Sequence, residues 1–167
     1  ASPGADRRRR PVTARVGFTG SQHGMTVEQA ATVARLLKED GATVLHHGVC
    51  IGADEEAHFI GQAQDIGAVL HPPKNKSKMS TRILDHTYCP VLGAGEVLNV
   101  YSPAEYIDRN HDIVDATEEL IAAPQRKIEV VRSGTWATIR YACKTGKPVR
   151  IVHFDGSIER RIPIVKS

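Results

Sequence analysis

The amino-acid sequence predicts an α/β fold in three layers, with a mostly parallel five-stranded sheet between two layers of helices. Short apolar runs rich in β-branched residues alternate with longer segments of helical periodicity. Glycine or a helix-capping residue stands at most of the junctions, and no longer internal repeat is visible. Strands that alternate with helices in this way imply right-handed crossovers and therefore parallel neighbouring strands.

The first strand and helix are predicted within residues 14–41. Residues 14–20, Ala-Arg-Val-Gly-Phe-Thr-Gly, indicate a strand that ends at glycine. Thr26 is expected to begin the helix, because Thr-Val-Glu-Gln has the capping-box pattern in which Gln29 reaches back to the helix start. Gly41 stands where a left-handed residue ends a helix. The apolar residues at helical spacing, which predict its buried face, are Val27, Ala30, Ala31, Ala34 and Leu37.

The second and third strands are predicted at residues 43–47 and 68–71. Between them, a glycine-bearing turn leads to Asp54, which is placed to cap a helix that runs to about residue 66. His46 and His47 are adjacent on the second strand and point to opposite faces. They are therefore not expected to bind one metal ion.

The second half of the chain predicts two more strands after a long irregular stretch. Residues 74–103 are first polar and basic and then interrupted by glycines, which predicts loops. The next helix is expected at about 104–116, with a buried side formed by Tyr106, Ile107, Ile113 and Val114. The remaining predicted elements are a strand at 120–123, a helix at 133–146, a strand at 149–152 and an edge strand at about 162–165.

Composition and charge limit the classes of function. Hydrophobic residues make up 41% and charged residues 25% of the 167 residues, as in ordinary globular domains, and no apolar run is long enough to span a bilayer. Residues 1–10 hold four arginines and one aspartate, which account for the whole net charge of +3, so residues 11–167 sum to zero. We therefore predict a disordered basic tail at residues 1–13 and a single domain at residues 14–167.

The cysteines and histidines predict a protein without metal. Cys50, Cys89 and Cys143 are odd in number and far apart, so they indicate neither a disulfide framework nor a zinc site. No HExxH or HxH spacing occurs among the eight histidines. A reducing cytoplasm is the expected compartment, and no membrane partner is expected.

The turns that follow the strands form the candidate site, because ligands of an open parallel sheet bind beyond the carboxyl ends of its strands. Glycine lets backbone N–H groups approach an anion, and a helix start favours negative charge. The segment before the last helix offers the best phosphate cradle, with two hydroxyls and a guanidinium. The candidate residues are Gly20, Ser21, Gln22 and His23 after the first strand, Gly48, Gly52 and Asp54 after the second, and Arg132, Ser133, Gly134 and Thr135.

Structural roles compete with these functional ones. Asp54 either caps its helix or binds ribose hydroxyls. Ser133 caps its helix, with or without a phosphate nearby. Trp136 either stacks on a base or packs in the core. The basic residues of the irregular stretch either close over phosphates or form a solvated surface; they are Lys74, Lys76, Lys78 and Arg82.

The motifs, in this order, resemble the SLOG superfamily of Rossmann-like domains, which groups proteins similar to DNA-processing protein A and the Lonely Guy phosphoribohydrolases. The resemblance covers about residues 16–152, in VGFTGS, HHGVCIGADEEAH, HPP, YIDRNHDIVDATEELIAAP and RSGTWATIRYACKTGKPV. It implies the strand order 3-2-1-4-5, a homodimer, and a pocket for a nucleotide or nucleotide derivative lined by the glycine-rich turns. It also implies that Arg109 and Asn110 face this pocket.

One departure from the family pattern bears on activity. Lonely Guy enzymes carry PGGxGTxxE, whose glutamate takes part in cleaving an N-glycosidic bond, whereas Thr138 stands in that place here. Threonine cannot act as a carboxylate base. We therefore expect a nucleotide or phosphorylated small molecule to be bound, with no further cofactor, as in a sensor or carrier. The alternatives are a single-stranded DNA-binding module and a nucleotide N-glycosidase or phosphoribohydrolase that uses another acid, such as Asp54, Glu55 or Asp108.

Overall fold

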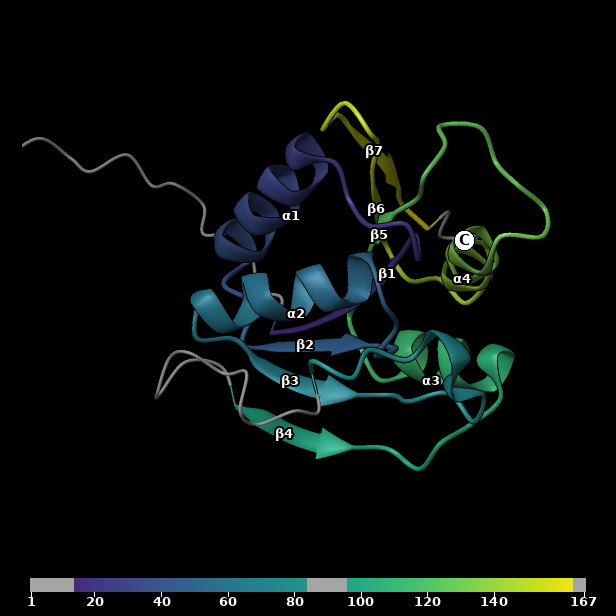
Figure 1. Ribbon diagram of the computed structural model, residues 1–167. Helices are drawn as coiled ribbons and strands as arrows, with labels where there is room; N and C mark the ends of the chain where they lie inside the picture. Colours follow the sequence, from purple (N-terminus) through teal and green to yellow (C-terminus); the bar gives the residue numbers. More distant parts are fainter. Residues whose placement is uncertain (1–13, 84–95, 164–167) are drawn as a thin grey trace, which may run out of the picture.

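The computed structural model describes residues 14–83 and 96–163, which form a seven-stranded sheet with helices on both faces (Figure 1). The strand order is β4-β3-β2-β1-β5-β6-β7, and every pairing is parallel except that of β6 with β7. Among these residues, no helix combines the length and the apolar character needed to cross a membrane. In chain order the elements are β1 (Arg15–Gly20), α1 (Val27–Asp40), β2 (Val44–His47), α2 (Ala53–Ala63), β3 (Gly67–Leu70), the 3₁₀ turn η1 (Lys76–Lys78), β4 (Val97–Val100), α3 (Tyr106–Asp115), β5 (Glu119–Ala123), α4 (Gly134–Lys144), β6 (Val149–Val152) and β7 (Ile158–Arg161).

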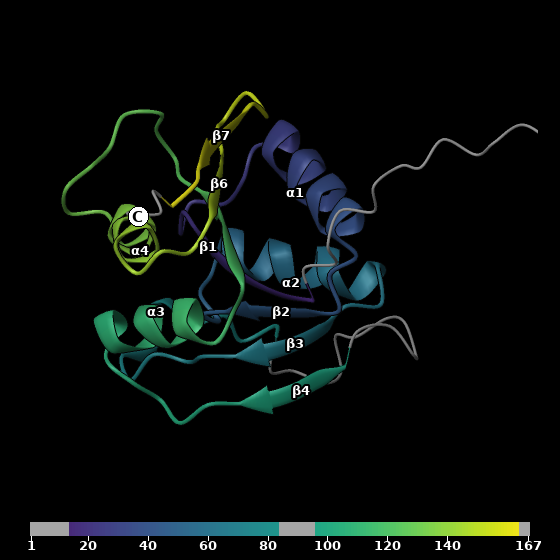
Figure 2. The same cartoon turned by 180° about the vertical axis from the view of Figure 1, so that it is seen from behind.

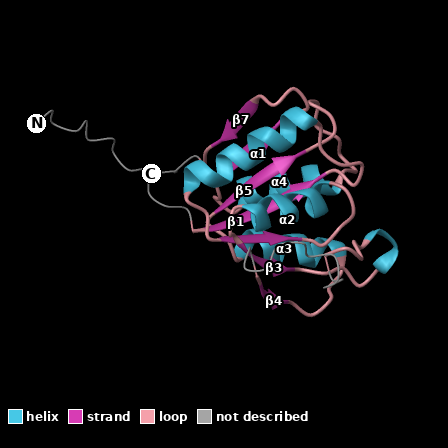
Figure 3. Cartoon of the chain, turned by 60° about the vertical axis from the view of Figure 1, so that its left-hand side comes forward, coloured by secondary structure: helices cyan, strands magenta, loops and turns pink. Residues whose placement is uncertain are grey.

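Two hydrophobic cores lie on the two faces of the sheet. Helices α1 and α2 cover one face (Figure 3), and α3 and α4 cover the other (Figure 2). Successive strand residues point to opposite faces, so β5 and β6 contribute to both cores, whereas β1 and β2 contribute to the first alone. Phe18 and Ile121 pack beneath α1 and α2, whereas Leu120 and Ala122 pack against Trp136 of α4. Of the two roles considered for Trp136, the structure supports core packing.

The predicted α/β class is confirmed, and β3-β2-β1-β5-β6 repeat the expected order 3-2-1-4-5. The predicted count of five strands is wrong, because two further strands lie at the sheet edges. β4 occupies part of the stretch expected as loops, and all four of its residues are exposed. β7 precedes the edge strand predicted at 162–165, whose last two residues lie outside the described ones. Neither edge strand carries the continuous apolar run of a strand buried on both faces.

Helix α1 begins as predicted but buries a partly different face. Thr26 and Gln29 form the capping box, and Gly41 is left-handed with φ of 63°. The predicted face is right for Leu37, which is buried, and wrong for Val27, which is 83% exposed. The buried residues of α1 are Gln29, Thr32, Val33, Leu36, Leu37 and Asp40. The polar members of this face have partners, as where Gln29 Nε2 donates to the carbonyls of Pro124 and Val152 at 3.0 Å each. Hydrogen bonding therefore replaces apolar packing along part of this face.

A buried ion cluster ties α1 to the sheet. Arg150 of β6 donates to the carboxylate of Asp40, at the end of α1, and to that of Glu119, at the start of β5. Burial and the hydrogen bond with Asp40 raise the pKa of Glu119 to about 7. The cluster lies toward the amino ends of the strands, away from the turns that follow them, so we assign it a structural role.

Candidate functional site

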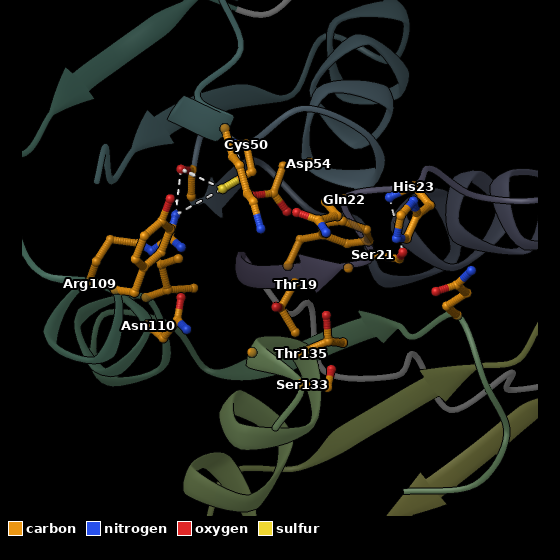
Figure 4. A pocket seen from close by; sticks show the side chains of 18 of the residues that line it. Thr19, Ser21, Gln22, His23, Cys50, Asp54, Arg109, Asn110, Ser133 and Thr135 are labelled. Atoms are coloured by element: carbon orange, nitrogen blue, oxygen red, sulfur yellow. Dashed lines mark hydrogen bonds between the residues drawn. The ribbon is translucent and has the colours of Figure 1, made fainter. Parts of the chain in front are cut away.

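A pocket of about 490 Å³ opens at the carboxyl end of the sheet (Figure 4). Its walls come from the turns after β1 and β2, from η1, from α3 and from the connection between β5 and α4. Gly52 does not line it, because its backbone packs on the turn after β1, where an added Cβ would overlap the Gln22 carbonyl. The other twelve predicted site residues line the pocket: Gly20, Ser21, Gln22, His23, Gly48, Asp54, Arg109, Asn110, Arg132, Ser133, Gly134 and Thr135.

The turn after β1 is held between two neighbouring elements. Gly20 is needed for close packing, because an added Cβ would overlap that of Ala53 in α2. The N–H of Ser21 donates to the carbonyl of Ala123 at the end of β5, at 3.1 Å. The Ser21 hydroxyl accepts from the N–H of His23, also at 3.1 Å. These contacts place the Ser21 hydroxyl and the start of α2 beside the pocket.

The turn after β2 is strained and closely packed. Val49 has φ of 59°, a left-handed conformation that is rare for a β-branched residue. Its N–H donates to His47 Nδ1 at 3.1 Å, and its carbonyl accepts from Ser80 N at 2.8 Å. An added Cβ at Gly48 would lie 1.9 Å from Arg109 Nη1, so only glycine leaves room for the guanidinium. Strain of this kind is concentrated at functional sites.

Asp54 does not cap α2. The N-cap is Gly52, and no side chain caps the helix. Asp54 lies in the first turn, only 6% exposed, and its Oδ2 accepts from the N–H of Cys50 at 3.3 Å. Burial raises the pKa of Asp54 to about 6, against the opposing effect of Arg109. The pocket wall thus carries a carboxylate that titrates near neutral pH.

Arg109 is a buried cation of the pocket, only 5% exposed. Its Nη1 donates to the Gly48 carbonyl at 2.5 Å and lies 3.5 Å from Cys50 Sγ. Its Nε has no hydrogen-bond partner. Among the described residues, the Arg109 guanidinium takes part in no ion pair. The guanidinium carbon lies 5.2 Å from the centre of the Tyr106 ring. A buried charge without an ion pair is costly, so this wall favours an anionic ligand.

The start of α4 faces the pocket at a point where space is open. Ser133 is the N-cap, and its hydroxyl accepts from Trp136 N at 3.3 Å. An added Cβ at Gly134 would meet no heavy atom within 4 Å. Thr138 does not line the pocket, because its buried hydroxyl donates to the Gly134 carbonyl at 2.8 Å. The unpaired N–H groups of a helix start are suited to a phosphate.

The basic stretch contributes one of its four cations to the pocket. Lys74 pairs with Glu105 at 3.8 Å and Arg82 with Glu55 at 3.4 Å, whereas Lys78 lines the pocket. Neighbours of the predicted turns and residues of η1 and α3 complete the walls. Besides Lys78, the lining residues that the prediction of the site omitted are Phe18, Thr19, Cys50, Asn75, Ser77, Tyr106, Ile113 and Gln125.

Four buried histidines form two pairs beside the turn after β2. His46 Nδ1 lies 2.8 Å from His71 Nε2, and His47 Nε2 lies 2.9 Å from His58 Nδ1. Because Val49 N donates to His47 Nδ1, the proton of His47 is on Nε2, and His47 donates to His58. Burial lowers the pKa of His46 and His58 to about 4 and that of His71 to about 3, and it holds the pKa of His47 well below its usual value.

The described residues contain no group of three side chains placed to hold a metal ion. His46 and His47 lie next to each other in β2 yet have different partners, as expected for residues that point to opposite faces. Cys50 and Cys143 are free thiols, and Cys89 lies outside the described residues.

Solved structures of other proteins share this fold. The molybdenum cofactor binding protein from Rippkaea orientalis has a TM-score of 0.60 at 19% identity, over 84% of this chain and 77% of that one. DNA processing protein A from Helicobacter pylori has a TM-score of 0.56 at 18% identity, and that from Streptococcus pneumoniae 0.57 at 19%. The matches cover 84% and 83% of this chain, and 65% and 50% of those proteins. This chain shares the Rossmann-like fold of these proteins.

The fold shared with DNA processing protein A is the one that the sequence motifs imply by resemblance, so the predicted fold is confirmed. No protein-family model matches the sequence, and no curated protein matches it. At these low identities the structural likeness establishes the fold alone. The function of this chain is therefore argued from the residues of its own pocket.

Proposed function

We propose that this protein binds a nucleotide or a nucleotide-derived ligand through a phosphate at the start of α4. The observation that carries the proposal is the open space beside Gly134, where the hydroxyls of Ser133 and Thr135 and the side chain of Arg132 line the pocket. The positive end of the helix dipole stabilises an anion at this place. In this proposal, Asp54 accepts hydrogen bonds from the ribose hydroxyls.

The proposal assigns binding without turnover, as in a sensor or carrier. Thr138 has no carboxylate, and its hydroxyl donates to the Gly134 carbonyl of its own helix rather than facing the pocket. Similar proteins are described as binding the molybdenum cofactor and single-stranded DNA, which supports a ligand-binding role. DNA itself has less support here, since residues 11–167 carry no net charge. The family resemblance supports a homodimer, which light scattering of the purified protein would test.

A nucleotide N-glycosidase is the second candidate, and a specific observation favours it. Asp54 is the one carboxylate among the described residues that line the pocket, and its pKa of about 6 suits a general acid. Glu55 and Asp108, the other acids considered from the sequence, do not line it. Base cleavage in this pocket would therefore depend on Asp54.

Calorimetric titration with AMP, CMP, ADP-ribose and NAD tests the proposal, with chromatography of each sample afterwards to detect released base. Gly134→Asp is expected to abolish binding, because a carboxylate beside the phosphate repels it. Gly134→Ala is the matched control, since open space surrounds this position. Binding with intact ligand supports a sensor or carrier, and released base supports the glycosidase. Unchanged affinity in Gly134→Asp would contradict the phosphate site at α4.

A further inference from the structure

The charged groups of the pocket lie on more than one wall. Arg132 belongs to the segment that leads into α4, where the proposed function places a phosphate. Arg109 belongs to α3, and Figure 4 shows it across the pocket from Ser133, with Thr19 between them. A single phosphate at α4 leaves Arg109 with the carboxylate of Asp54 as its nearby negative charge, and the two are not joined in an ion pair.

Arg109 has the features of an unfilled anion contact. It is 5% exposed and lines the pocket, and its Nε has no partner. One of its donors is used by the Gly48 carbonyl, a neutral group. Guanidinium groups have five N–H donors and pair well with phosphate. Holding such a group away from water is costly unless an anion comes to it.

Asp54 and Arg109 approach the same glycine. An added Cβ at Gly48 would lie 3.1 Å from Asp54 Oδ2 and 1.9 Å from Arg109 Nη1. A ribose that bonds to Asp54 would therefore turn its 2′ and 3′ oxygens toward Arg109. In dinucleotide folds an acidic residue recognises a free ribose hydroxyl, and where the ribose is phosphorylated an arginine accommodates that phosphate instead. The pocket of this chain holds both kinds of residue.

We propose that the ligand is a free nucleoside bisphosphate, with its 5′-phosphate at the start of α4 and a second phosphate, on the 2′ or 3′ oxygen, at Arg109. This inference rests on the proposed function and specifies the ligand of the same pocket. Among the described residues, Lys78, Arg109 and Arg132 bring three positive charges to the lining, against the single carboxylate of Asp54. This excess of positive charge suits two phosphates better than one.

Calorimetry with AMP, ADP, adenosine 2′,5′-bisphosphate and adenosine 3′,5′-bisphosphate tests the inference on the unmodified protein. One of the two bisphosphates is expected to bind at least about 10-fold more tightly than AMP, as for one added charge-assisted contact. ADP controls for added charge, because its extra phosphate lies on the 5′ side. Equal affinity for AMP and both bisphosphates would overturn the inference and leave the proposed function standing. Tighter binding of ADP than of either bisphosphate would also overturn it.

Substitution of the two arginines locates the second phosphate. Arg109→Gln is expected to remove the preference for the bisphosphate while AMP affinity changes less than about threefold. Arg132→Gln, at the other wall, is expected to weaken all these ligands by a similar factor and to keep the preference. Arg109→Lys keeps the charge and serves where Arg109→Gln fails to fold. A preference that survives Arg109→Gln would overturn the assignment.

Two further outcomes separate this inference from the proposed function. A short single-stranded oligonucleotide is included as a competitor, because each of its internal nucleotides also carries phosphate on both sides of the sugar. Stronger binding of the oligonucleotide than of either bisphosphate would overturn the free ligand in favour of a nucleic-acid strand. Absence of binding by every nucleotide would overturn the proposed function, and this inference with it.

Discussion

Acidification from pH 7 to pH 5 is expected to lower the free energy of unfolding, because four buried histidines must gain protons when the chain unfolds. The pKa is about 4 for His46 and His58 and about 3 for His71, and it is well below its usual value for His47, whereas an unfolded histidine titrates near 6.5. A group whose pKa is lowered by folding contributes its full stability at pH values above its pKa in the unfolded chain. That stability is lost as the pH falls from about 6.5 toward 4.

The size of the loss follows from the pKa differences. At pH 5 each of His46, His58 and His71 costs about 2 kcal/mol relative to its unfolded state, or about 6 kcal/mol for the three. Asp54 and Glu119 act in the opposite direction, because their pKa values are raised to about 6 and about 7 and the folded chain binds their protons first. Together they raise the free energy of unfolding by about 4 kcal/mol at pH 5. The net loss from these groups is therefore about 2 kcal/mol, and the lowered pKa of His47 adds to it; a typical domain has roughly 5–15 kcal/mol in all.

Urea unfolding at pH 7, 6 and 5 measures this loss, with the fluorescence of Trp136, the single tryptophan, as the signal. His58→Gln removes one titrating group and leaves an amide oxygen to accept from His47. This variant is expected to lose about 2 kcal/mol less than the wild type between pH 7 and pH 5. His23→Gln changes an exposed histidine and is expected to follow the wild type. Stability that rises on acidification, or an identical pH dependence in His58→Gln, would refute the reasoning.

Three substitutions test other residues of the site. Asp54→Ala is expected to weaken ribose-containing ligands more than inorganic phosphate in calorimetry, and equal weakening would contradict the ribose contact. Gly48→Ala is expected to lower the free energy of unfolding by about 1–3 kcal/mol, because the new methyl overlaps Arg109; an unchanged value would show that the guanidinium moves aside freely. Thr138→Glu is expected to lower stability by several kcal/mol, because it buries a carboxylate, and to release no base from AMP. Chromatographic detection of free adenine would show that the new carboxylate reaches the pocket.

The central strands were predictable because both of their faces are covered. Leu120 and Ile121 point to opposite cores, so a strand of this kind is apolar at successive positions. The edge strands have no such pattern, since β4 is exposed throughout and three of the four residues of β7 are charged. The buried face of α1 was missed in part for a related reason. Its buried residues include Gln29 and Asp40, which tertiary hydrogen bonds satisfy, and periodicity of apolar residues cannot find them.

The candidate pocket was predictable where it depends on local structure. Gly20 and Ser133 stand at strand-to-helix turns, and such turns converge at one edge of a parallel sheet. Asn75, Ser77 and Lys78 depend instead on contacts between distant segments, such as the bond from Ile51 N to the Lys78 carbonyl at 2.9 Å. The role of Asp54 could not be decided from the sequence either. The N-cap and the first turn of a helix are adjacent positions, so an aspartate near a helix start fits both.

The orientation of α3 is the strongest structural argument for an anionic ligand. The sequence predicts that Ile107 is buried, yet it is 70% exposed, while Arg109 is buried in the same helix. Burying an isoleucine is worth about 1.5–3 kcal/mol, and withdrawing a guanidinium from water costs several kcal/mol, so both effects oppose this orientation. Ile113 and Val114 pack in the core and hold the helix in place. The bonds from Arg109 Nη1 to the Gly48 carbonyl and to Cys50 Sγ, and the nearby carboxylate of Asp54, offset only part of the cost. The second phosphate of the proposed ligand would supply further stabilisation, so the orientation of α3 supports the further inference.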